Sequence, residues 1–146
     1  RLPEALAERC LDSLRRPLPR VELGLCLRGL AHAAIDISDG LLADLGHILE
    51  RSGVAAEVFV AQLPPLPPDA DPVLARRCQL AGGDDYELMF SASPEKRSEL
   101  AALAGTLALP LWRCGHLLGS VPGSLAVFGE EGQLLAIDQR GYDHFG

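Results

Sequence analysis

The sequence contains little basic charge and few aromatic residues. Its 146 residues include 13 basic and 20 acidic side chains, which give a net charge of −7, and Lys96 is the one lysine. Proteins that bind nucleic acids carry a basic face, so this balance excludes a nucleic-acid partner. The longest apolar-leaning stretch, Leu100 to Trp112, is interrupted by Gly105, Thr106 and Pro110. It is too short to cross a bilayer, which excludes a membrane-spanning protein.

Several signatures of common cofactor sites and enzymes are also absent. No P-loop, no Rossmann glycine fingerprint and no G-x-S-x-G elbow occurs in the chain. The first residues, Arg-Leu-Pro-Glu, lack an initiator methionine and a signal-peptide pattern, as we expect of a fragment. No C-x-x-C pair indicates zinc or redox chemistry, so we expect buried free thiols in a reducing cytoplasm for the four cysteines, Cys10, Cys26, Cys78 and Cys114.

The hydrophobic content of 48% is enough for one domain with its own core. Apolar spacing, proline and glycine predict helices over 3–16, 21–31, 38–53, 72–81 and 93–105, and strands over 33–37, 54–60, 86–90, 111–118, 125–128 and 133–137. Helices and strands interleave, and a hairpin joins the last two strands. The expected fold class is therefore α/β (α+β), a layered mixed β-sheet packed with helices.

A first candidate site lies at Asp36–Gly40, where a buried strand passes into a helix. Strand alternation places Asp36 and Ser38 on one side, and the turn can bring Asp39 beside them. Such carboxylates suit a nucleotide only if Mg²⁺ lies between them and the phosphates. Alternatively, Ser38 and Asp39 are an ordinary helix cap. A cap does not need Asp36, whose unpaired charge between Ile35 and Ile37 would be costly.

A second candidate site is the segment Gly82–Leu88. We expect Gly82, Gly83, Asp84 and Asp85 to form a tight turn, in which adjacent glycines let the backbone approach a ligand closely. Glu87 shares a strand face with Asp85 and can accept hydrogen bonds from an amino group or ring nitrogen of a ligand. The alternative is a solvated acidic turn with Tyr86 packed underneath.

The C-terminal residues Gly141–Phe145 contain two of the chain's seven aromatic side chains. They can stack on a flat heterocycle or anchor the terminus. The histidines show no metal-ligand spacing, so we interpret them as structural or surface residues: His32, His47, His116 and His144.

Three segments together resemble the C-terminal domain of the thiamine-monophosphate kinase family. They are Ala34–Leu41 (AIDISDGL), Ala81–Leu88 (AGGDDYEL) and Gly141–Phe145 (GYDHF), and they occur in the family's order and spacing. Pro19-Arg20 and Ser52-Gly53-Val54 are also similar to that family. The resemblance covers essentially the whole chain, 1–146. It implies a fold similar to the C-terminal domain of aminoimidazole ribonucleotide synthetase.

The resemblance also implies a function and a set of site residues. The reaction would be transfer of the γ-phosphate of ATP to thiamine monophosphate, with several Mg²⁺ ions, to make thiamine diphosphate. Asp36 and Asp39 would bind Mg²⁺, Ser38 would contact ATP, and Glu87 and Phe145 would contact the thiamine substrate. No residue acts as a covalent nucleophile, because catalysis consists of positioning and metal-assisted in-line transfer.

The family also has an N-terminal domain that supplies further ATP- and Mg²⁺-binding acids and most of a homodimer contact. Nothing in this chain resembles that domain, so we expect the isolated chain to fold but to have little or no kinase activity. Two alternatives stay open. The chain can belong to another ATP-dependent enzyme of the superfamily, such as one catalysing amidine ring closure or selenide phosphorylation, or it can be a non-catalytic domain that binds nucleotide or thiamine phosphate.

Overall fold

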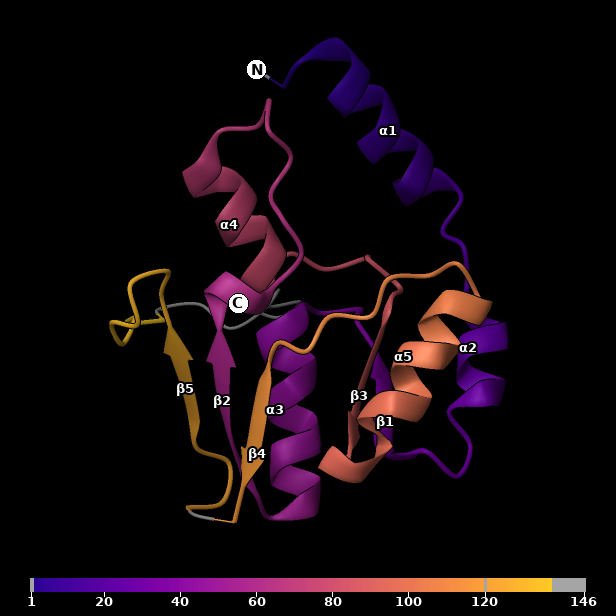
Figure 1. The fold of residues 1–146 in the computed structure, drawn as a ribbon. Coiled ribbons are helices and arrows are strands. Elements are labelled where there is room, and N and C mark those ends of the chain that lie inside the picture. The colour runs from indigo at the N-terminus through magenta and orange to yellow at the C-terminus, as the bar shows by residue number, and fades with distance from the viewer. Residues whose placement is uncertain (1, 120, 138–146) are drawn as a thin grey trace.

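The computed structural model describes residues 2–119 and 121–137 (Figure 1). The α-helices are α1 (Glu4–Arg15), α2 (Val21–Cys26), α3 (Leu41–Ser52), α4 (Pro72–Ala81) and α5 (Arg97–Thr106). The strands are β1 (Ala31–Asp36), β2 (Ala55–Phe59), β3 (Leu88–Ala92), β4 (Gly115–Leu118) and β5 (Leu125–Phe128), and two short 3-10 helices cover Val60–Gln62 and Pro94–Lys96. This mixture confirms the α+β fold class.

The strands form two sheets. In one, β1 and β3 pair antiparallel, and in the other, β2 lies between β4 and β5, antiparallel to β4 and parallel to β5. The three-stranded sheet is therefore mixed, as expected. The sequence suggested that a final hairpin would make the sheet mixed, whereas in the structure the parallel pairing of β2 with β5 does so. In the predicted hairpin, Leu134 makes only an isolated bridge to Phe128, so 133–137 is not a full strand.

Helix α3 lies between the two sheets and supplies much of the core (Figure 1). Its five predicted apolar positions are all buried: Leu41, Leu42, Leu45, Ile48 and Leu49. They pack with Ala56 and Val58 of β2, Val127 of β5 and Met89 of β3. The helix ends at Gly53, which adopts the left-handed conformation (φ 65°) that glycine tolerates. Because α3 contacts both sheets, its first turn has a fixed position.

The N-terminal helix is much less buried. In α1 only Leu6 is buried, and Leu11 and Leu14 are exposed. Figure 1 shows α1 extending beyond the two sheets. The predicted helix over 21–31 is shorter, because α2 ends at Cys26 and β1 begins at Ala31.

Other sequence expectations need correction. Cys10, Cys26 and Cys78 are exposed and Cys114 is partly buried, so the thiols are free as expected but three of them are not buried. The predicted strand over 111–118 begins only at Gly115, because residues before it do not pair with β2 apart from one bond from the Phe59 N–H to the Cys114 carbonyl. Within the described residues, no helix is both long and apolar enough to cross a membrane.

Candidate functional site

Two acidic motifs, the first at Asp36–Gly40 and the second at Gly82–Leu88, lie side by side, because the β1–β3 pairing continues past the ends of both strands. Asp36 is in register with Leu88. Beyond that pair, the Ile37 N–H donates to the Glu87 carbonyl at 2.8 Å, and the Ile37 carbonyl accepts from the Tyr86 N–H at 2.8 Å. The Ser38 carbonyl then accepts from the Asp84 N–H at 2.9 Å. Two segments separated by some fifty residues of sequence thus form one acidic site.

The first motif is fixed by a side chain from outside it. Asp44, in the first turn of α3, is 2% exposed. Its Oδ2 accepts hydrogen bonds from the backbone N–H groups of Ser38 (2.9 Å), Asp39 (3.1 Å) and Gly40 (3.2 Å). The prediction that Ser38 caps the helix is wrong, because Gly40, which has no side chain, occupies the cap position.

Asp36 occupies a different environment from the one inferred from its neighbours. Along β1, partly buried and exposed positions alternate, and Asp36 lies on the exposed side whereas Ile35 packs against the core. The expected cost of a buried, unpaired charge therefore does not arise, because water solvates the carboxylate. What keeps Asp36 relevant is its place beside the second motif.

The second motif is an irregular segment and not the predicted tight turn. A side chain at Gly83 would collide with the Ser38 carbonyl oxygen, so this glycine permits close approach to another backbone segment rather than to a ligand. Asp84 and Tyr86 have φ angles of 64° and 51°, in the left-handed region that disfavours side-chain-bearing residues. The pairing with the first motif maintains this strained conformation.

Charge interactions link the exposed side chains of the second motif. Arg20 forms a bidentate ion pair with Glu87, from Nε to Oε2 at 2.8 Å and from Nη2 to Oε1 at 2.6 Å, and this bond raises the pKa of Arg20. Partial desolvation, then the charges of Glu87 and Asp84, raise the pKa of Asp85. The pKa of Tyr86 is raised because its hydroxyl donates to Asp84 at 3.0 Å, with smaller effects from the Asp84 and Asp36 charges.

The side-chain oxygens at this site are suitable ligands for a hard divalent cation. The candidate residues of the first motif and Glu87 lie in the two paired segments, where carboxylate and hydroxyl oxygens predominate: Asp36, Ser38, Asp39 and Glu87. Magnesium prefers such oxygens, with waters and phosphate oxygens completing its shell. Within the described residues, one group offers three ligand atoms all within 4.8 Å of one another, namely Asp39, Asp44 and His47. Phe145 lies outside the described residues.

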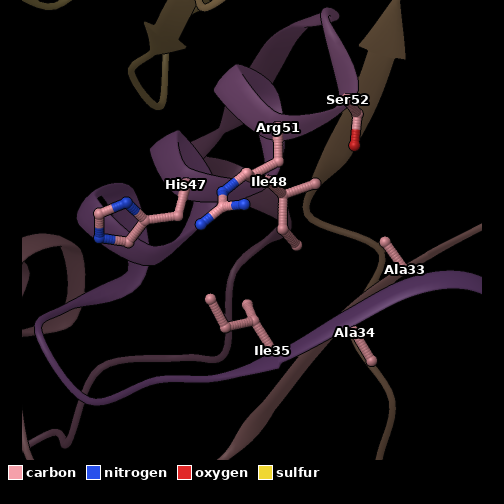
Figure 2. Close-up of a pocket in the computed structure, with 7 residues that line it drawn as sticks. All are labelled: Ala33, Ala34, Ile35, His47, Ile48, Arg51 and Ser52. Atoms are coloured by element: carbon pink, nitrogen blue, oxygen red, sulfur yellow. The ribbon is translucent and has the colours of Figure 1, made fainter.

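A shallow pocket of about 370 Å³ lies elsewhere, between β1 and α3 (Figure 2). Ile35 and Ile48 point toward one another across it, and His47 and Arg51 project from α3 at its border. None of the candidate residues lines this pocket. The four candidate residues therefore lie outside this pocket, although His47 both lines it and belongs to the group with Asp39 and Asp44.

Two residues of the site, Asp44 and Arg20, lie outside the sequence motifs. Asp44 has the weak signal of an acid in the first helical turn, one turn after Gly40, which is also typical of a helix-dipole effect. Arg20 is 67 positions from Glu87, and no local pattern predicts that pair. His47 was interpreted as a structural or surface residue. It is exposed, but it contributes to the three-ligand group.

Comparison with known proteins agrees with this architecture. The family model for AIR synthase related protein, C-terminal domain, matches residues 11–127. Thiamine-monophosphate kinase of Escherichia coli K12 is 40% identical over 133 residues, which are 89% of this chain and 40% of that protein. The chain thus spans about two fifths of the length of this curated relative.

Two solved structures are similar in fold. Thiamine-monophosphate kinase from Stenotrophomonas maltophilia K279a has a TM-score of 0.76 and 44% identity, with 92% of this chain and 42% of that chain covered. AaThiL complexed with AMPPCP and TMP has a TM-score of 0.68 and 27% identity, with 92% and 40% covered. With the family model matching most of its length, the chain belongs to the family of AIR synthase related proteins, C-terminal domain, and its relatives there include thiamine-monophosphate kinases.

Proposed function

We propose that this chain forms the C-terminal part of a kinase, a phosphotransferase with a phosphate group as acceptor, that transfers the γ-phosphate of ATP to thiamine monophosphate and so makes thiamine diphosphate. The pairing of residues 36–38 with 84–88 carries this proposal, because it joins two acidic motifs into one surface. The similarity to thiamine-monophosphate kinases over 89% of the chain supports the choice of substrate. AaThiL complexed with AMPPCP, an analogue of ATP, and TMP supports both ligands.

In this proposal each candidate residue has a distinct task. Asp36 and Asp39 hold Mg²⁺, which supplies the positive charge that allows phosphate oxygens to approach carboxylates. The hydroxyl of Ser38 donates to ATP. Glu87 accepts a hydrogen bond from the thiamine moiety, and its bidentate pairing with Arg20 holds the carboxylate in one orientation for this contact. Phe145 contacts the same substrate. The protein positions the two phosphates for in-line attack and no covalent enzyme intermediate forms.

The rest of the active site belongs to a second domain in this proposal. The chain covers 40–42% of the length of the relatives compared above, and the domain preceding it there would supply further metal- and ATP-binding acids and most of a homodimer contact. We place the enzyme in the cytoplasm, where ATP and free thiols are abundant. We expect the 146-residue chain alone to form no measurable thiamine diphosphate.

A hybrid enzyme tests this function. The chain replaces the matching 133 residues of the Escherichia coli relative, and thiamine diphosphate is quantified by its fluorescent oxidation product after incubation with ATP, Mg²⁺ and thiamine monophosphate. We expect activity in the hybrid and a loss of at least about 100-fold in Asp39→Asn, because a metal ligand is removed. Glu50→Gln, which removes an exposed carboxylate from α3, is the matched control and retains activity. A folded hybrid that binds ATP but leaves thiamine monophosphate unchanged would contradict the proposal.

A further inference from the structure

Asp44 is the one charged residue that is buried within the described part of the chain, at 2% exposure. A buried carboxylate is costly unless hydrogen bonds compensate for its lost hydration. Here a single oxygen, Oδ2, accepts from three consecutive backbone N–H groups, at 2.9, 3.1 and 3.2 Å. Consecutive N–H groups in a turn form a concave anion-binding site, and in this molecule the protein's own carboxylate occupies it.

These bonds differ from ordinary helix capping. A capping side chain precedes the helix and accepts from N–H groups inside it, whereas Asp44 lies inside α3 and reaches back to residues that precede the helix. The three donors belong to Ser38, Asp39 and Gly40. Two of these are the candidate ATP and metal residues, so the bonds act on the backbone that carries their side chains.

The opposite side of the same segment is also fixed. The carbonyl groups of Ile37 and Ser38 accept from the N–H groups of Tyr86 and Asp84, each within 2.9 Å. The turn is therefore held by its N–H groups through Asp44 and by its carbonyl groups through the second motif. Ligating residues whose backbone is held on two sides in this way lose little conformational freedom when an ion or phosphate binds, and this favours binding.

We propose that Asp44 is a positioning residue, which holds the turn Ser38–Gly40 so that Ser38 and Asp39 face their ligands in one fixed geometry. This inference rests on the proposed function. It assigns a positioning task to Asp44 through its Oδ2, which three backbone donors already engage. The carboxylate also adds negative charge next to Asp39, with ligand atoms of the two residues within 4.8 Å, and this charge strengthens the attraction for a cation.

Three variants of the 146-residue chain separate the contributions. Asp44→Asn keeps an acceptor oxygen but removes the charge, Asp44→Ala removes both, and Glu50→Gln removes one exposed charge from the same helix. The first readout is amide hydrogen exchange at residues 38–40, measured by NMR. The second is the apparent affinity for Mn²⁺, used as a probe for the divalent site and measured by paramagnetic broadening of the same amides.

We expect exchange at residues 38–40 to accelerate at least about tenfold in Asp44→Ala, with a smaller increase in Asp44→Asn and none in Glu50→Gln. Mn²⁺ affinity should fall about tenfold or more in Asp44→Ala, be partly restored in Asp44→Asn, and stay within about twofold in Glu50→Gln. A purely stabilising role would leave Mn²⁺ affinity unchanged in a variant that remains folded.

Unchanged exchange and Mn²⁺ affinity in folded Asp44→Ala would overturn the proposal. If Asp44→Ala fails to fold, the Asp44→Asn variant provides the test. The proposal would be overturned if Asp44→Asn and Glu50→Gln showed the same amide exchange at residues 38–40 and the same Mn²⁺ affinity. The proposed function fails separately: if the unaltered chain shows no Mn²⁺ broadening near Asp39, the metal assignment is lost, while exchange at residues 38–40 still tests whether Asp44 holds the turn.

Discussion

The two acidic motifs are held in different ways, although they lie side by side. In the turn Ser38–Gly40, a buried carboxylate from Asp44 satisfies the backbone from within. In the segment 82–87 the carboxylates point outward, and two residues, Asp84 and Tyr86, have strained φ angles. The comparison shows that acidic residues next to one another have separate tasks: Asp44 stabilises the backbone from within, whereas Glu87 and Asp84 interact with other side chains at the surface.

The close backbone contact between the two segments gives the largest expected effect. In Gly83→Ala the new Cβ collides with the Ser38 carbonyl oxygen, which belongs to backbone and cannot rotate away. We expect a loss of about 2 to 3 kcal/mol in the free energy of unfolding, typical of overpacking, measured by urea denaturation. The strained segment then separates from the turn.

Gly46→Ala is the matched control for that substitution. Gly46 lies inside α3, and a Cβ there would meet no atom within 4 Å. Alanine favours helix over glycine, so the control should gain about 0.5 to 1 kcal/mol. A Gly83→Ala variant as stable as the parent chain would show that the two segments do not need close contact.

The ion pair between Arg20 and Glu87 gives a smaller effect. Its side chains are 28% and 49% exposed, so water and salt screen the attraction. A double-mutant cycle with Arg20→Ala and Glu87→Ala should give a coupling energy of about 0.5 to 1 kcal/mol that declines in 1 M salt. A coupling above about 2 kcal/mol would be typical of a buried ion pair and would contradict the expected screening by solvent.

Much of the fold was predictable from local patterns. The helix over 72–81 and the strand over 125–128 match α4 and β5 residue for residue. Asp71 caps α4 by accepting from the Leu74 N–H, and Pro72 suits the first helical position. The five buried leucine and isoleucine positions of α3 follow the helical period. Such features depend only on residues a few positions apart.

Long-range features were not predictable in this way. The division of the strands into two sheets depends on pairing between β1 and β3, which lie more than fifty residues apart. At the site, sequence motifs identified Asp36, Ser38, Asp39 and Glu87 as candidates, and their roles remain proposals. The motifs did not reveal that Asp36 is exposed, that Asp44 supports the turn, or that Arg20 reaches Glu87, because these facts depend on the tertiary fold.

The smallest expected effect concerns the outward-facing acids and depends on pH. Burial and the charges of Glu87 and Asp84 raise the pKa of Asp85 in the folded chain above its ordinary value of 3.8. A raised pKa means that the folded state binds the proton more tightly than the unfolded state. This contribution to stability is fully present below pH 3.8 and is lost as the pH rises through the higher pKa of the folded chain.

Asp85→Asn removes the ionisable carboxyl group, so the variant does not lose this stability as the pH rises. At pH 7 the variant should be more stable than the parent by a few tenths of a kcal/mol, since solvent screens much of the repulsion, and at pH 3 the two should be equal. Thermal unfolding at both pH values measures the difference, with Asp69→Asn in the exposed proline-rich connection as the control. Equal stability of Asp85→Asn and the parent at pH 7 would mean that the outward-facing carboxylates do not repel one another, and the second motif would then need no cation to balance its charge.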